Sequence, residues 1–139
     1  MDKKEIYEFL KLRDLCVLST TNDGQSQSSL MGFGISEDLD FVFGTSNKSR
    51  KYNNVQKNKN VSIVVGFTEG KTIQCEGVVE FLEGEELERY KNIYFTLRPS
   101  VKKYELLPDQ VYFKVKLNWL RYTDVTKKPW DIKEIKFSN

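Results

Sequence analysis

Apolar and polar residues alternate along much of the chain, which is the pattern of β-strands that bury one face. The clearest example lies towards the C-terminal end, where Val111, Phe113, Val115 and Leu117 alternate with Tyr112, Lys114 and Lys116. Similar apolar or alternating runs predict strands over residues 15–21, 26–36, 40–45, 61–67, 72–82 and 110–117, of which the last continues over 119–125, and residues 132–137 would add a seventh. In the fifth of these strands, Gly77 predicts a bend or a bulge.

Three segments are expected to be helices. Residues 3–13 and 83–97 repeat their apolar positions with the helical period. Residues 50–57 form a shorter and more polar segment between two strands, and Pro99 ends the last helix.

Many short strands separated by turns are typical of a β-barrel or a β-sandwich. One such turn is Asn22-Asp23-Gly24-Gln25, which joins the first two predicted strands. Long strands that contain glycines favour the barrel in a single chain of 139 residues. The sequence therefore predicts one domain over residues 1–139, mainly β, with six or seven antiparallel strands and flanking helices.

Composition limits the class of protein further. Hydrophobic residues make up 39% of the chain and charged residues 30%, which are ordinary proportions for a soluble protein. No apolar run approaches a membrane-spanning length, and the first residues lack the apolar core of a signal peptide, so we expect a cytoplasmic protein. The net charge of +2 does not indicate a general attraction to nucleic acid.

The chain contains no histidine, and this excludes several kinds of chemistry. A Ser–His–Asp triad, a Cys–His dyad and histidine-ligated zinc or haem all require that residue. The two cysteines, Cys16 and Cys75, are far apart in apolar contexts and are expected to be reduced core residues. The absence of histidine therefore favours a bound cofactor that carries its own reactivity, or no catalysis at all.

Hydroxyls and cations are concentrated in the segment Thr45–Lys51, between a predicted strand and a predicted helix. A helix N-terminus attracts anions through its unpaired N–H groups and its partial positive charge. Ser46 or Ser49 can cap the helix or donate to a phosphate, and Arg50 and Lys51 offer positive charge. From these residues alone, a phosphate site and a solvated basic loop are both open.

Three stretches in this order and spacing resemble the pyridoxamine 5'-phosphate oxidase-like family of FMN-binding split barrels. They are QSSLMGFGI (27–35), LDFVFGTSNKSRKYNNVQKNKNVSIVV (39–65) and IQCEGVVEFL (73–82). The resemblance implies an antiparallel split β-barrel, FMN as the cofactor, and a homodimer with the flavin at the interface between the subunits.

The resemblance also assigns expected contacts to the flavin ring. In this family the second strand lays its backbone along the ring, which implies that role for Ser29, Leu30, Met31 and Gly32. The small residues Gly32 and Gly34 would either allow a planar ligand to approach or permit the barrel to curve.

Other parts of the flavin have their own expected contacts. The family's residues for the ribityl chain and the phosphate match Thr45, Ser46, Ser49, Arg50 and Lys51. A polar side chain after the next turn often reaches the ring, and the nearest matches are Thr72 and Gln74. Trp119 would either cover the flavin of the partner chain or be a core or interface tryptophan.

Several positions depart from the oxidases that act on vitamin B6. Those enzymes have an aromatic residue at the position of Gly44, an arginine and a lysine at those of Ser29 and Gly34, and a tryptophan at that of Lys114. They also use an arginine and a histidine near the C-terminus, where this chain offers only Arg121. The sequence therefore resembles the shorter, general members of the family, whose substrates are usually unassigned.

Three functions follow as hypotheses. The first is an FMN-dependent oxidoreductase that uses NAD(P)H as the donor and reduces an unassigned small molecule. The second is a non-catalytic module that binds flavin or deazaflavin to store or sense it. The third is an OB-like nucleic-acid-binding barrel, against which the small net charge and the core-facing positions of most aromatic residues argue.

Overall fold

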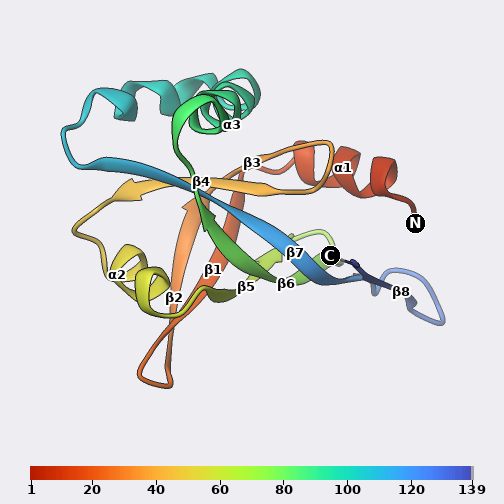
Figure 1. The fold of residues 1–139 in the computed structure, drawn as a ribbon. Coiled ribbons are helices and arrows are strands. Elements are labelled where there is room, and N and C mark those ends of the chain that lie inside the picture. Colours follow the sequence, from red (N-terminus) through yellow and green to blue (C-terminus); the bar gives the residue numbers. More distant parts are fainter. Residues whose placement is uncertain (139) are drawn as a thin grey trace.

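The computed structural model describes residues 1–138, which form one curled β-sheet with helices around it (Figure 1). The helices and strands are, in chain order, α1 (Lys3–Lys11), β1 (Leu15–Asn22), β2 (Gln25–Gly32), β3 (Gly34–Ile35), β4 (Phe41–Ser46), α2 (Arg50–Lys57), β5 (Asn60–Val65), β6 (Lys71–Phe81), α3 (Gly84–Leu97), the 3₁₀ helix η1 (Pro99–Leu106), β7 (Gln110–Asp124) and β8 (Asp131–Lys136). Within this range, no helix combines the length and the hydropathy that crossing a membrane requires.

The sheet is antiparallel, and its strand order is β2-β1-β5-β6-β7-β4-β3, with β8 paired to β7. β2 and β3 lie at opposite ends of this order, yet only Phe33 separates them in the chain. The sheet therefore has to curl until its two ends meet, because one residue cannot span a flat sheet. This closure at Phe33 confirms the predicted mainly β, antiparallel split barrel.

The ends of some strands differ from the expectation. The strand expected over residues 26–36 is divided into β2 and β3, because the chain passes there from one end of the sheet to the other. The strand expected over residues 110–117 and its continuation over 119–125 form the single long strand β7, in which the alternation of buried positions shifts by one residue at Asn118. Pro99 ends α3 as predicted, but the chain continues directly as η1, which was not predicted.

Gly77 marks a shift in the pairing of β6 with β7, as predicted. Glu76 pairs with Trp119 and Gly77 with Leu117, so Asn118 is an extra residue on β7. A Cβ at Gly77 would lie 2.6 Å from the carbonyl oxygen of Lys116. Only glycine fits where the strands approach so closely.

The interior of the barrel is filled by apolar side chains. A row of four buried phenylalanines runs through it, with neighbouring ring centroids 5.1, 6.1 and 5.6 Å apart: Phe33, Phe41, Phe43 and Phe113. Burial of a side chain of this size stabilises the fold by about 2–3 kcal/mol. Cys16 and Cys75 are free and buried in the same core, as expected, and burial raises the pKa of Cys16 to about 12.

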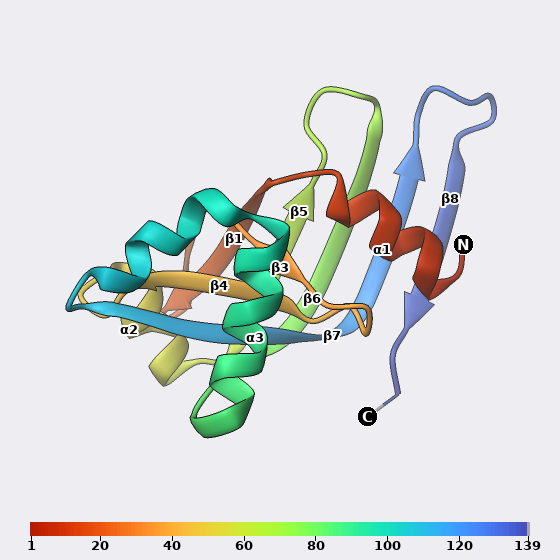
Figure 2. The same ribbon diagram turned by 90° about the horizontal axis from the view of Figure 1, so that it is seen from above.

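A second apolar cluster lies outside the barrel, where α3 packs across β4 and β7 (Figure 2). Its buried members are Val42, Leu82, Tyr90, Tyr94 and Tyr112. This cluster explains why three consecutive residues of β4, Phe41–Phe43, are all buried: successive side chains point to opposite faces, and both faces are covered.

α3 approaches the sheet most closely at two glycines. A Cβ on Gly34 would lie 3.0 Å from both Cα and Cδ1 of Tyr94, and a Cβ on Gly32 would lie 3.3 Å from the Tyr94 hydroxyl. Gly34 therefore makes room for α3, a role that the sequence analysis did not consider.

Arg98, which follows α3, ties together the chain segments around it. Its guanidinium donates hydrogen bonds to the main-chain carbonyls of Phe33, Leu10, Lys11 and Arg13. These bonds connect the end of α3 with the end of α1 and with the β2–β3 link. They use four of the five N–H donors of the guanidinium for holding the main chain.

The substitution Gly34→Ala is expected to lower the free energy of unfolding by about 1–3 kcal/mol, because the new methyl group meets the main chain of α3. Gly32→Ala is the matched control, since its Cβ would meet only the end of the Tyr94 side chain, at 3.3 Å. Urea denaturation measures both. Equal losses for the two variants would contradict the direct packing of α3 on β3.

Candidate functional site

The barrel is split between β2 and β4. β3 pairs with β4, with Gly34 opposite Val42, and this register would place Gly32 opposite Gly44 if it continued past Phe33. Among residues 1–138, however, β2 and β4 do not pair. One edge of each strand is therefore left without a neighbouring strand, and its main-chain groups are available to a ligand.

A cavity of about 340 Å³ lies in this split. Its lining comes from five elements and comprises Leu30, Met31, Gly32, Gly44, Thr45, Tyr94, Val101, Tyr104, Gln110 and Tyr112. The volume is at the lower end of the range for small-molecule sites. The structure thus brings together four of the residues that were expected to contact a cofactor: Leu30, Met31, Gly32 and Thr45.

Thr45, which lines this cavity, connects it to the cluster of hydroxyls and cations at the start of α2. The Thr45 hydroxyl donates to the Ser49 hydroxyl at 3.2 Å, and Ser49 caps α2 by accepting from the N–H of Tyr52, also at 3.2 Å. Arg50 is exposed and Lys51 half-buried, and neither forms an ion pair with another described residue. Both cations are therefore available to an anion.

α2 is held in place by a buried amide. The side chain of Asn54 donates to the hydroxyl of Thr20 at 3.0 Å and to the side-chain carbonyl of Gln27 at 2.9 Å. Val55 is buried beside it in the barrel core. These contacts fix the helix, and with it Ser49 and its neighbours, against β1 and β2.

The remaining expected contacts do not lie in the cavity. Ser46 accepts from the N–H of Lys48 at 3.1 Å, and Ser29 lies on β2 outside the lining. Gln74 and Trp119 line a separate hollow of about 300 Å³ on the outer face of the sheet. Thr72 lines neither space, so one chain alone does not bring these three late residues to the cavity.

The sequence analysis missed one side of the cavity, which we call the tyrosine wall: Tyr94, Val101, Tyr104, Gln110 and Tyr112. Periodicity assigned Tyr94 to the apolar face of a helix and Tyr112 to the polar face of a strand. The assignment of Tyr94 agrees with its burial, but Tyr112 is buried as well, because α3 covers its face of β7. The wall combines α3, η1 and β7, and no local pattern relates those segments.

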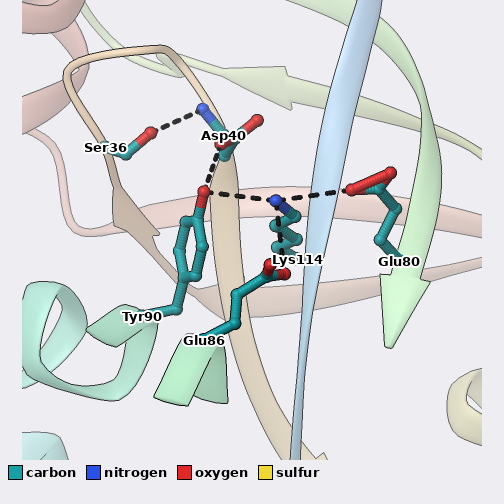
Figure 3. Close-up of polar contacts among 6 residues, drawn as sticks. All are labelled: Ser36, Asp40, Glu80, Glu86, Tyr90 and Lys114. Carbon is teal, nitrogen blue, oxygen red and sulfur yellow. Dashed lines mark hydrogen bonds and ion pairs between the residues drawn. The ribbon is translucent and has the colours of Figure 1, made fainter. Parts of the chain in front are cut away.

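Lys114, at the family's tryptophan position, belongs to a polar network under α3 and not to the cavity (Figure 3). The Tyr90 hydroxyl donates to Asp40 Oδ2 at 2.7 Å and accepts from Lys114 Nζ at 3.2 Å. Lys114 also pairs with Glu80 at 3.3 Å and Glu86 at 3.5 Å. The network joins α3 to β4, β6 and β7.

The protonation states of this network suit a structural role. Burial lowers the pKa of Lys114, but the hydrogen bond with Tyr90 and the charges of Asp40 and Glu80 outweigh it and hold the pKa above its ordinary value. Burial and the hydrogen bond to Asp40 raise the pKa of Tyr90. Both groups keep their protons at neutral pH, so the network packs α3 and does not transfer protons.

The fold and the site define a class: a split antiparallel barrel with a cavity in the split and a cationic helix start beside it. The chain belongs to the pyridoxamine 5'-phosphate oxidase family, whose model matches residues 2–124. This confirms the resemblance drawn from the sequence. No protein of curated function matches the chain.

Known structures share the fold at low sequence identity. The heme-binding protein from Mycobacterium smegmatis is 17% identical with a TM-score of 0.83, over 96% of this chain and 57% of that one. ChuZ from Campylobacter jejuni is 20% identical with a TM-score of 0.80, over 96% of this chain and 58% of that one. General Stress Protein 26 from Bacillus anthracis is 22% identical with a TM-score of 0.75, over 99% of this chain and 100% of that one. The chain thus spans little more than half the length of the first two proteins.

The contribution of Tyr90 to stability is expected to depend on pH. Because its pKa is raised in the folded protein, this contribution is complete below the ordinary value of about 10 and declines as the pH rises through the folded value. The difference in free energy of unfolding between the wild type and Tyr90→Phe should therefore shrink from about pH 8 to about pH 11.

Urea denaturation at each pH measures this difference. Tyr104→Phe is the control, because that tyrosine is exposed. A Tyr90→Phe difference that stays constant over the whole range would contradict the coupling of the Tyr90 proton to folding.

Proposed function

We propose that the protein is an FMN-dependent oxidoreductase with NAD(P)H as its electron donor. The observation that carries the proposal is the split between β2 and β4, where a cavity and two free strand edges lie beside two unpaired cations. Flavin mononucleotide has a planar ring with polar edges at one end and a dianionic phosphate at the other. The cavity and the free strand edges suit the ring, and the two cations suit the phosphate.

The residues present fit the parts of FMN separately. Leu30, Met31 and Gly32 would hold the ring, together with Thr45, through main-chain groups and small or apolar side chains. The phosphate would lie at the start of α2, where its N–H groups and the side chains of Ser46, Ser49, Arg50 and Lys51 converge. When bound, FMN supplies the hydride chemistry, and the protein needs no histidine for it.

We propose a homodimer because some of the expected flavin contacts lie outside the cavity of their own chain. Gln74 and Trp119 lie on the outer face of the sheet, away from the cavity of the same chain. A second copy packed on this face would bring them, and Thr72, to the first copy's ligand. The Trp119 ring is already oriented there, because its Nε1 donates to Glu134 Oε1 at 2.7 Å and the Arg121 guanidinium lies over the ring.

Experiment can distinguish two other functions from an FMN-dependent oxidoreductase. A non-catalytic flavin or deazaflavin module would take up the cofactor without oxidising NAD(P)H. The structural similarity to the heme-binding protein from Mycobacterium smegmatis suggests a haem protein as the second alternative, but this chain has no histidine, and tyrosine is the ligand that the cavity would offer to iron. Burial raises the pKa of Tyr94 to about 12, which works against a tyrosinate ligand. We therefore favour flavin, in a cytoplasmic enzyme.

The wild-type protein is expected to take up FMN, and Arg50→Ala combined with Lys51→Ala to weaken its binding by about 2–5 kcal/mol, because charge-assisted contacts to the phosphate are lost. Quenching of flavin fluorescence measures the affinity. Consumption of NADH by the loaded protein separates an enzyme from a binding module.

Lys57→Ala combined with Lys59→Ala is the matched control. It removes the same charge from the other end of α2, where both side chains are exposed, and should leave the affinity nearly unchanged. If Arg50→Ala with Lys51→Ala binds FMN as tightly as the wild type, the phosphate does not lie at the start of α2. A protein that takes up haem and not FMN would overturn the proposal.

A further inference from the structure

We propose that the tyrosine wall selects an uncharged planar substrate ring that accepts a hydrogen bond from Tyr112. The inference rests on the proposed function, since it concerns the molecule that would meet a flavin held by β2 and β4. It names the substrate class that this cavity admits and the residue that orients the substrate there.

The first argument is the absence of charge in the lining. Among the described residues that line the cavity, none is acidic or basic, and the polar ones are three tyrosines, Gln110 and Thr45. A buried carboxylate or phosphate without a cationic partner is strongly disfavoured, whereas an uncharged ring loses little on leaving water. The cavity therefore excludes charged groups, whatever their shape.

The second argument is that two cations near the wall, Arg98 and Lys91, are already used, whereas Lys103, beside the Tyr104 ring at 5.2 Å, is exposed to solvent. Arg98 donates to four main-chain carbonyls. Lys91 pairs with Glu105 at 2.7 Å and with Glu88 at 3.6 Å, although its Nζ lies 5.5 Å from the centre of the Tyr112 ring. Neither is free to neutralise an anionic substrate without losing these contacts.

The third argument is an unsatisfied hydroxyl. Tyr112 is 9% exposed, and its oxygen is buried without a hydrogen-bond partner. Burial raises its pKa more than the neighbouring Gln110 amide lowers it, so the hydroxyl keeps its proton and remains a donor. An unpaired buried hydroxyl destabilises the protein, and a hydrogen bond to a carbonyl or amide oxygen of a ligand would remove this penalty.

The local packing links this hydroxyl to a departure from the vitamin B6 oxidases. At Gly44, where they have an aromatic residue, a Cβ would lie 2.7 Å from Gln110 Nε2 and 2.8 Å from Tyr112 Cε1. Gln110 and Tyr112 thus occupy the space beside Gly44. Two polar, uncharged side chains from β7 replace one aromatic side chain from β4 in the wall of the cavity.

Nicotinamide and nicotinate test the proposal, because they have the same ring and size and differ in charge. Equilibrium dialysis against the wild-type protein, with and without FMN, should show nicotinamide bound at least about tenfold more tightly than nicotinate. Tyr112→Phe should weaken nicotinamide binding by about threefold to tenfold, because it removes only the hydroxyl. Tyr122→Phe, a buried tyrosine elsewhere on β7, is the control and should change nothing.

A second variant guards against a folding defect in Tyr112→Phe. Val101→Arg introduces a cation at a half-buried position of the lining and should reverse the preference in favour of nicotinate. Equal binding of the two compounds, tighter binding of nicotinate to the wild type, or binding of neither would overturn the proposal. FMN uptake is measured on the same preparations. A protein that binds nicotinamide selectively but takes up no FMN would refute the proposed function, while the selectivity of the cavity for uncharged ligands would still hold.

Discussion

The structure depends on one short link, Gly32-Phe33-Gly34, which carries the chain from one end of the sheet to the other. Phe33 fills the barrel interior, and its carbonyl accepts a hydrogen bond from Arg98. The absence of a side chain at Gly34 lets Tyr94 rest directly on the link. The same few atoms therefore close the barrel, seat α3 and, through Arg98, hold the end of α1.

The position of the cavity follows from this arrangement. The link brings β3 into register with β4 for only two residues, and beyond them β2 and β4 diverge. A fully paired barrel would use the main-chain groups of both strands and leave no space between them. α3 and η1 then cover the opening from the outside and turn a gap between strands into a cavity with a tyrosine wall.

Local patterns in the sequence predicted the local structure well. Alternation and turn residues located the strands, the bounds of α2 were predicted at Arg50–Lys57, and the bulge was predicted at Gly77. These features depend on neighbouring residues, so one sequence contains the signal for them. The cluster of hydroxyls and cations over Thr45–Lys51 was found for the same reason, since its residues are consecutive. The tyrosine wall was not, because η1 lacked a strong pattern and Tyr94 and Tyr112 meet only after α3 folds back on the sheet.

The distribution of charge determines the orientation in which a ligand can bind at the site. Two unpaired cations lie at the start of α2, whereas Arg98 and Lys91 near the tyrosine wall are held by carbonyls and carboxylates. Because an anion gains most where a cation has no other partner, a ligand with one charged end can bind in only one orientation, with that end at α2. The uncharged end then lies in the split, and whatever approaches it through the tyrosine wall meets hydroxyl and amide groups alone. In the proposed function, charge would fix the orientation of the cofactor, and the absence of charge at the wall would select the molecule that the cofactor meets.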